Sequence, residues 1–310
     1  MGREFQLIQR YLSLYGAGPQ VTLGVGDDAA VLNLPPNTEL VVSTDTLVEG
    51  RHFPELTLPE HIATRAIGTA ASDLAAMAAE PLAMTIALTL PSADELWLHS
   101  FSQGLASAVQ QFSLPLVGGD LTRGPVSVTV TVNGTVPAGR ALGRGGARPG
   151  DRLCVTHTLG DAAAGLALVS GLWDSDHTLT SDQEQFLEDR FYQPTPRLDW
   201  AGWLRDNATA AIDISDGLLA DVGHLARASG LGCRLDSSCL PFSAPLATVN
   251  RQQRLDWALA GGDDYELAVA VPVGVELPAH LTRVGEFVSG DGVECDYMPG
   301  RQLGYDHFGA

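Results

Sequence analysis

The chain has 310 residues, of which 45% are hydrophobic and 18% charged, which is typical of a globular protein large enough for two domains. Its 37 acidic residues against 18 basic ones give a formal net charge of -19, which excludes a basic footprint for nucleic acid or for an anionic membrane. All 18 basic residues are arginine, which also excludes mechanisms that need a P-loop lysine, a protein-kinase strand lysine or a Schiff-base lysine.

Periodic segments predict the elements of the first half of the chain. Apolar residues recur at helical spacing from Phe5 to Tyr15, and the β-branched run from Glu39 to Asp45 predicts a strand that ends in polar residues. Capping-box patterns at Thr57–Glu60 and Ser92–Glu95 predict the starts of two long helices. Further strands are expected over 82–90 and 126–136.

A Gly-rich segment over 143–151 predicts a domain boundary. The expected domains are therefore residues 1–142 and 143–310. In the second domain, strands are expected over 152–156, 208–214 and 265–271, and helices over 161–170 and 217–228. Strands that alternate with helices in both halves predict an α/β (α+β) fold of two domains.

The four cysteines do not form a C-x-x-C pair, so neither a zinc site nor a thioredoxin-like site is expected. Scattered cysteines in a long chain favour a reduced, cytoplasmic protein. The sequence has no apolar run near the length of about 20 residues that a membrane-spanning helix needs, and its N-terminus does not resemble a signal peptide.

The chemical signal lies in six acidic motifs that are expected at strand ends or Gly-flanked turns. They cover residues 26–28, 43–45, 72–73, 118–120, 213–217 and 261–264. Clustered carboxylates repel one another, and a hard cation such as Mg²⁺ removes that penalty while binding phosphate oxygens. Together with the missing lysines, the motifs predict that ATP is held through several Mg²⁺ ions.

Other interpretations apply to single motifs. Asp beside Gly also favours helix caps and Asx turns, and Asp216 could cap a helix that starts near Gly217. Residues 24–29 fit the dinucleotide pattern G-x-G-x-x-A. The residues after them do not predict a helix, and two aspartates would face the pyrophosphate, so a dinucleotide site is rejected.

Taken in order, the motifs resemble those of the thiamine-monophosphate kinases, which share the aminoimidazole-ribonucleotide-synthetase-like (PurM-like) fold. The resemblance spans nearly the whole chain. It rests on the segments 24–30, 43–53, 72–77, 118–120, 143–151, 213–218, 264–267 and 304–308.

The resemblance implies an enzyme that moves the γ-phosphoryl group of ATP directly onto thiamine monophosphate, giving thiamine diphosphate, with no phosphoenzyme. It also implies a homodimer whose N-terminal domains pair through their mixed sheets, and a C-terminal α/β domain. No nucleic acid or membrane partner is implied.

Site residues follow from the resemblance, motif by motif. The magnesium shell would be Asp28, Ser43, Thr44, Asp45, Asp73, Asp120, Asp213 and Asp216, with catalysis centred on Asp45, Asp120 and Asp213. ATP would contact Gly119, Asp120, Arg144 and Ser215. Thiamine monophosphate would contact His52, Asp264 and Tyr305.

Two positions depart from the family pattern. Leu121 stands where many relatives have Thr, and Asp263 stands where Glu is common, so either Asp263 or Asp264 could contact the substrate. Two other functions stay open: another ATP-using relative such as aminoimidazole ribonucleotide synthetase, or a protein that binds magnesium and nucleotide without turnover.

Overall fold

The structure is a computed structural model that describes residues 2–174, 178–300 and 304. The chain divides into two compact units: residues 1–74 with 79–141, and residues 75–78 with 142–310. Among the described residues, none of the helices combines the length and the apolar character needed to cross a membrane.

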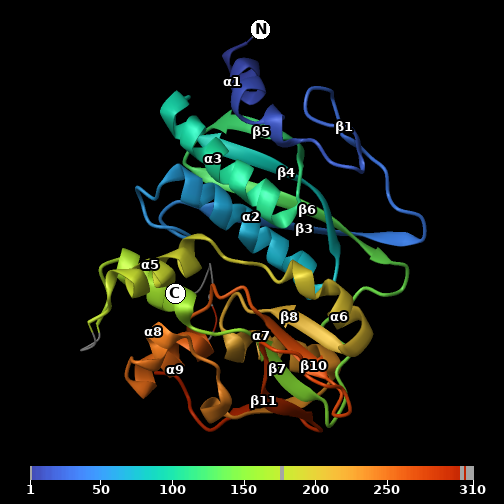
Figure 1. The fold of residues 1–310 in the computed structure, drawn as a ribbon, viewed down its shortest axis with the longest axis vertical. Coiled ribbons are helices and arrows are strands. Elements are labelled where there is room, and N and C mark those ends of the chain that lie inside the picture. Colours follow the sequence, from blue (N-terminus) through green and yellow to red (C-terminus); the bar gives the residue numbers. More distant parts are fainter. Residues whose placement is uncertain (1, 175–177, 301–303, 305–310) are drawn as a thin grey trace. The chain divides into compact units, whose positions relative to one another are not determined.

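The N-terminal unit contains a four-stranded sheet with helices on one face (Figure 1). Its helices are α1 (Arg3–Tyr11), the 3-10 turn η1 (Ser13–Tyr15), α2 (Pro59–Ala76) and α3 (Glu95–Phe112). Its strands are β1 (Val21–Leu23), β2 (Val31–Leu32), β3 (Thr38–Val48), β4 (Glu80–Leu90), β5 (Leu116–Arg123) and β6 (Ser127–Pro137).

The sheet of this unit runs in the order β3-β6-β4-β5, and β1 and β2 form a separate small ladder. Strand β6 alternates between buried valines and half-buried polar residues, so the strand has one apolar face and one polar face. The apolar face, with Val130 and Val132 fully buried, is the one that α2 and α3 cover (Figure 1). The other face displays mainly threonines and is called the open face below.

Neither expected capping box starts its helix. Helix α2 begins at Pro59, whose fixed φ suits the first helical position, and the Thr57 hydroxyl donates to the Pro54 carbonyl at 2.8 Å. Asp94, not Ser92, caps α3, because its side chain accepts from the N–H groups of Leu96 and Trp97. The two predicted boxes were therefore wrong, because Pro and Asp nearer each helix supply better starts.

The C-terminal unit contains a six-stranded sheet in the order β12-β9-β11-β7-β10-β8. Its strands are β7 (Arg152–Thr156), β8 (Ala210–Asp213), β9 (Gly232–Leu235), β10 (Leu267–Val271), β11 (Leu281–Val288) and β12 (Gly292–Cys295). Its helices are α4 (Asp161–Val169), α5 (Ser181–Tyr192), α6 (Ala201–Asn207), α7 (Leu218–Ser229), α8 (Ala244–Ala247) and α9 (Arg251–Ala260), with 3-10 turns η2 (Leu198–Trp200) and η3 (Ser237–Cys239).

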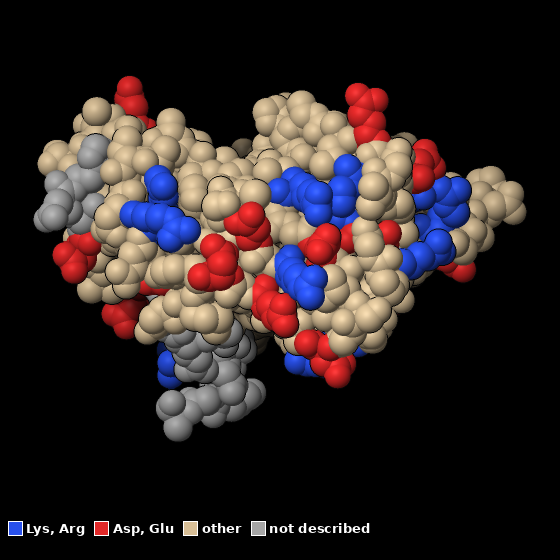
Figure 2. Space-filling view, turned by 90° about the horizontal axis from the view of Figure 1, so that it is seen from below, with Lys and Arg blue, Asp and Glu red and all other residues tan. Residues whose placement is uncertain are grey.

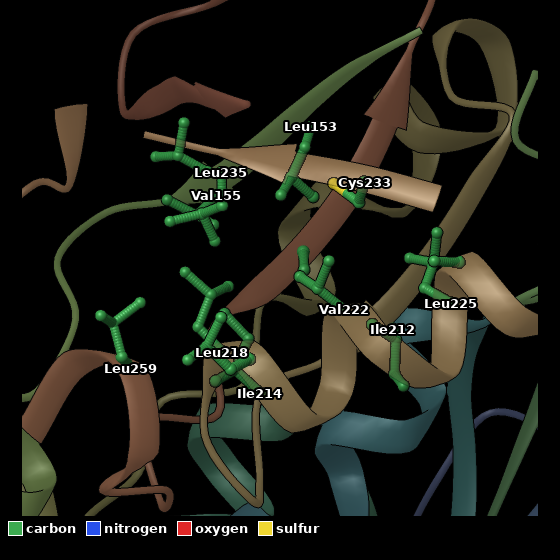
Figure 3. Packing of buried hydrophobic residues seen from close by; sticks show 14 of the residues in the cluster. Leu153, Val155, Ile212, Ile214, Leu218, Val222, Leu225, Cys233, Leu235 and Leu259 are labelled. Atoms are coloured by element: carbon green, nitrogen blue, oxygen red, sulfur yellow. The ribbon is translucent and has the colours of Figure 1, made fainter. Parts of the chain in front are cut away.

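Helix α7 packs against this sheet and closes the largest apolar cluster of the unit (Figure 3). Leu218, Val222 and Leu225 recur on one face of α7 and are fully buried against strands β7, β8 and β9. Strand β10 is buried at every position because it lies inside the sheet between β7 and β8. This packing fixes the start of α7 beside the end of β8.

Charges of both signs mix on the face that Figure 2 shows. Arginine side chains lie among Asp and Glu there rather than forming one continuous basic surface. That face therefore lacks the electrostatic footprint of a nucleic-acid-binding protein.

Replacing Leu225 by Ala tests the packing of α7. The side chain is fully buried in the cluster, so its loss should lower the free energy of unfolding by about 2–5 kcal/mol. Urea denaturation followed by circular dichroism measures the loss. Leu172→Ala, at a side chain that is 73% exposed, is the control and should change little; equal stabilities of the two variants would contradict the packing described.

Candidate active site

Two carboxylates face each other beneath the helices of the N-terminal unit. Asp45 on β3 and Asp73 on α2 interact, and the Ser43 hydroxyl donates a hydrogen bond to the Asp73 carboxylate. Burial first, and then the charge of Asp73, raise the pKa of Asp45 to about 6. The three side chains offer only oxygen atoms, which is the donor set that Mg²⁺ prefers.

These residues lie inside elements rather than at the strand ends expected from the sequence. Strand β3 continues past Asp45 to Val48 because β6 pairs with it along its whole length. Asp73 lies in the last turns of α2, and the Gly118–Asp120 motif lies within β5. The end of a strand depends on how far its partner strand pairs with it. The polar residues near Asp45 did not reveal that β6 continues the pairing.

Thr44 points away from Asp45, as alternation along a strand requires. Its hydroxyl shares a hydrogen bond of 2.9 Å with that of Thr131 on β6, and Thr46 and Thr129 repeat this contact at 2.8 Å. Both pairs lie on the open face of the sheet. Ser43 and Thr44 of the same motif are therefore presented on opposite faces.

Asp120 lies on the open face as well. It is level with the exposed Ala87 of β4, whose partner on β6 is Thr129. Asp45 belongs to the next row, with Val130 and Ile86. Strands β3 and β5 are also three strand spacings apart, about 14 Å. Within one chain, therefore, the sheet does not bring Asp45 and Asp120 together.

Gly119 allows β5 to lie unusually close to β4. Its φ is +150°, and a Cβ atom there would lie 1.9 Å from the Ile86 carbonyl oxygen. Any other residue would push β5 away from the sheet and move Asp120 with it.

Asp28 and His52 differ in how firmly they are held. Asp28 is exposed, and its N–H donates to the Asp27 carboxylate at 2.9 Å. The His52 ring accepts from the Val48 N–H through Nδ1 at 3.0 Å, and its carbonyl accepts from the buried Arg65 at 3.0 Å. Since Nδ1 accepts, the ring proton lies on Nε2.

Two loops of the C-terminal unit form the second acidic group. Asp213 ends β8 and is 5% exposed, and Ser215 and Asp216 follow in the loop before α7. The second loop, residues 261–266, donates from the Asp263 N–H to the Ser215 carbonyl at 2.8 Å. A Cβ atom at Gly262 would lie 2.5 Å from that carbonyl oxygen, so only glycine allows this approach.

Asp221, which sequence reasoning did not identify, is buried beside this group. Its carboxylate accepts from the backbone N–H groups of Ser215 and Asp216, both at 3.0 Å. Burial raises its pKa to about 8, with the charge of Asp213 as the next cause. One sequence signal could have identified Asp221. It is the fourth residue of the helix that follows the acidic motif at residues 213–217.

Asp264 caps a helix instead of facing solvent. It is 1% exposed, and its two oxygens accept from the N–H groups of Gly160 and Ala162, at the start of α4, at 2.8 and 3.5 Å. Burial raises its pKa well above the usual value. Its neighbour Asp263 is half-buried, and the Tyr265 hydroxyl donates to it at 3.1 Å.

A cluster of buried charged side chains anchors the second loop, residues 261–266, through Glu266. Glu266 is fully buried and accepts from Arg190 at 2.9 Å, from Arg197 Nε at 2.7 Å and from the Thr156 hydroxyl at 2.6 Å. Burial alone would lower the pKa of Arg190, but its acidic neighbours, Glu266 first, raise it. Sequence reasoning missed these arginines because they come from a distant part of the chain.

The remaining expected residues are less constrained or lie outside the described ranges. Arg144 is exposed, and its carbonyl accepts from the Ser229 hydroxyl at 3.0 Å. Tyr305 lies outside the residues that the structure describes. Within those residues, no group of three or more His, Cys, Asp or Glu side chains is arranged to hold a metal ion by itself.

Family models and relatives identify the family of the chain. Residues 26–136 match the N-terminal domain of AIR synthase related proteins, and residues 148–289 match their C-terminal domain. The thiamine-monophosphate kinase of Escherichia coli K12 is 44% identical over 98% of both chains, and that of Caulobacter vibrioides is 38% identical over 97% of this chain and 88% of its own.

The chain belongs to the thiamine-monophosphate kinases. Its fold is similar to the thiamine-monophosphate kinase of Stenotrophomonas maltophilia K279a, with a TM-score of 0.81, 40% identity and coverage of 94% and 95%. A structure named AaThiL complexed with AMPPCP and TMP has a TM-score of 0.80 at 33% identity, with 92% of each chain covered. The predicted two-domain fold and the predicted thiamine-phosphate kinase class are thereby confirmed.

Replacing Glu266 by Gln tests the ion cluster. The change leaves Arg190 and Arg197 buried without their common counter-ion, so the free energy of unfolding should fall by about 3–5 kcal/mol. Denaturant titration measures it. Glu294→Gln, which removes the exposed partner of Arg234, should have little effect; a stable Glu266→Gln protein would show that the cluster does not hold the loop.

Proposed function

We propose that this chain transfers the γ-phosphoryl group of ATP directly to the phosphate of thiamine monophosphate, with several Mg²⁺ ions bound between its carboxylates and the phosphates. The observation that carries the magnesium role is the Asp45–Asp73 pair. The charged group acting on buried Asp45 is another carboxylate, so ionising both is unfavourable until a cation joins them. Relatives named thiamine-monophosphate kinase, and the structure of AaThiL complexed with AMPPCP and TMP, support the reaction.

The reaction needs little proton transfer. A phosphate oxygen of thiamine monophosphate forms the new bond to the γ-phosphorus, and the bond from that phosphorus to the bridging oxygen of ADP breaks. The acceptor is already ionised, so the chain contributes positioning and charge neutralisation. Bound Mg²⁺ would supply that neutralisation.

The family resemblance, together with the described geometry, suggests specific roles for the chain's own residues; Tyr305 lies outside the described residues and is assigned from the resemblance alone. Ser43, Asp45 and Asp73 in one unit, and Asp213 and Asp216 in the other, would hold the metal ions. Thr44 and Asp28 would complete the shell. Gly119, Arg144 and Ser215 would contact ATP, and His52 and Tyr305 the thiamine phosphate.

We assign the acidic substrate contact to Asp263 rather than Asp264. Both Asp264 oxygens face the N–H groups at the start of α4, and the side chain is 1% exposed. Asp263 is half-buried, so part of its side chain is open to solvent, and it sits in a left-handed turn with φ of +62°.

The first experiment incubates the protein with ATP, Mg²⁺ and thiamine monophosphate and follows thiamine diphosphate by chromatography. The wild-type protein should form it only with magnesium. Asp45→Asn should lower kcat roughly 10²–10³-fold, because a metal ligand and its charge are lost. Normal turnover by this variant would contradict the role of Asp45.

The same variant carries its own folding control. The folded-state pKa of Asp45 lies above its unfolded value, so ionisation costs stability as the pH rises from about 4 to 6 and beyond. In magnesium-free buffer at pH 8, Asp45→Asn should therefore be more stable than the wild type by about 1–3 kcal/mol. A variant that loses activity while gaining stability cannot be inactive through unfolding.

We further propose that the active protein is a homodimer in which Asp120 serves the partner's metal site. Asp45 and Asp120 lie on opposite faces of the sheet and about 14 Å apart. Ligands of one Mg²⁺ ion must lie within about 2 Å of it. The open face bearing Asp120 also exposes Leu40 and Val42 of β3, by 47% and 54%, which suits pairing with a second sheet.

Mixing two inactive variants tests this arrangement. Refolded together, Asp45→Asn and Asp120→Asn chains should recover activity, up to about a quarter of the wild-type value, because half of the dimers carry one intact site. Activity that stays at the level of the single variants would place both residues in a site made by one chain. Light scattering on each variant alone checks that the dimer still forms.

A cytoplasmic location also fits the chain. Its four cysteines, Cys154, Cys233, Cys239 and Cys295, are all unpaired, as expected in a reducing compartment. ATP, one of the two proposed substrates, is supplied there.

A further inference from the structure

The loop between β8 and α7 is fixed by hydrogen bonds on two sides. On one side, the loop of residues 261–266 makes three backbone hydrogen bonds to it. The Ile214 N–H donates to the Glu266 carbonyl at 2.8 Å, and the Tyr265 N–H donates to the Ile214 carbonyl at 2.9 Å. The Asp263 N–H donates to the Ser215 carbonyl. On the other side, the N–H groups of Ser215 and Asp216 bond to Asp221.

Both of these last bonds use the same oxygen atom of Asp221. Oδ2 accepts from Ser215 and Asp216 at 3.0 Å each, and the side chain is 3% exposed. Asp221 lies in the first turn of α7, whose apolar face is packed into the core of the unit. The rigid helix therefore sets where this acceptor lies, and the acceptor sets the direction of two consecutive peptide groups.

The placement carries an electrostatic cost. The neighbours of Asp221 include the carboxylates of Asp213 and Asp216, which act against its ionised form. A hydrogen-bond acceptor at this point is nevertheless required, because two partly buried N–H groups without a partner would be costly.

We propose that Asp221 is a positioning residue for the kinase reaction: by accepting from the Ser215 and Asp216 N–H groups, it aims these two residues at the ATP–magnesium complex. The inference rests on the proposed role of this loop in the nucleotide site. Asp221 contributes through its acceptor atom and does not touch the substrates. A misplacement of about 1 Å in such a loop can reduce in-line transfer roughly 100-fold.

The test compares Asp221→Asn with Asp221→Ala. The amide oxygen of Asn can still accept both N–H groups, whereas Ala removes the acceptor. We expect kcat to fall roughly 10–100-fold in the Ala variant, with the KM for thiamine monophosphate nearly unchanged, and to stay within about threefold of wild type in the Asn variant. Steady-state kinetics with varied thiamine monophosphate, at saturating ATP and Mg²⁺, gives both parameters.

Asp236→Ala is the matched control. That carboxylate also accepts from a backbone N–H, of Ser238 at 2.9 Å, but it caps η3 and takes no part in either loop. It should leave kcat unchanged, and thermal unfolding of every variant is measured so that kinetics are compared well below each melting temperature. A loss of kcat in Asp236→Ala equal to that in Asp221→Ala would overturn the inference, since general destabilisation would explain both.

Two further outcomes would overturn it. Wild-type kcat in Asp221→Ala would show that the loop needs no such support, and an Asn variant as impaired as the Ala variant would show that the negative charge itself is needed. Asp213→Asn separates the inference from the function on which it rests. Full activity of Asp213→Asn would show that the loop has no part in the nucleotide site. An inactive Asp213→Asn protein together with a normal Asp221→Ala protein would overturn only the positioning role of Asp221.

Discussion

The repulsion between carboxylates held at close range is the constraint on which this structure depends. Each unit buries or half-buries acidic side chains beside one another: Asp45 with Asp73 in one, and Asp213 with Asp216 and Asp221 in the other. Burial, and next the charge of a neighbouring carboxylate, raise the pKa of Asp45 and of Asp221, which weakens the fold unless something compensates. Under the proposed function this cost has a use, because the same carboxylates would bind the cations that neutralise the phosphates in a chain without lysine.

Three kinds of partner stabilise the buried carboxylates of the chain. The kind of partner distinguishes carboxylates that support the fold from those proposed to act in the site. Glu266 is matched by two arginines, Asp264 by the N–H groups at the start of α4, and Asp221 by two consecutive N–H groups of a loop. Asp45 faces Asp73, which is another carboxylate. Glu266, Asp264 and Asp221 therefore support the loops, whereas the Asp45–Asp73 pair, in which one carboxylate acts on another, is where we propose that magnesium binds.

Strand pairing then decides which acids can work together. Because side chains alternate along β3 and β5, residues one position apart face different sides of the sheet. The pairing places Asp45 under the helices and Asp120 on the open face. Under the proposal that one metal site uses both residues, that site would be built from two copies of the chain, and the reaction would require the dimer.

The sequence by itself determined the family, the two-domain α/β class and the acidic motifs, because these depend on local pattern and on the order of motifs along the chain. It also located α3 and β7 within a few residues, since their apolar periods are strong. Only the tertiary structure decided that Asp264 is a buried cap and that Glu266, Arg190 and Asp221 support the loops. Burial and hydrogen-bond partners come from residues distant in the chain, and strand register, which sets the face of each carboxylate, is fixed only when the strands pair.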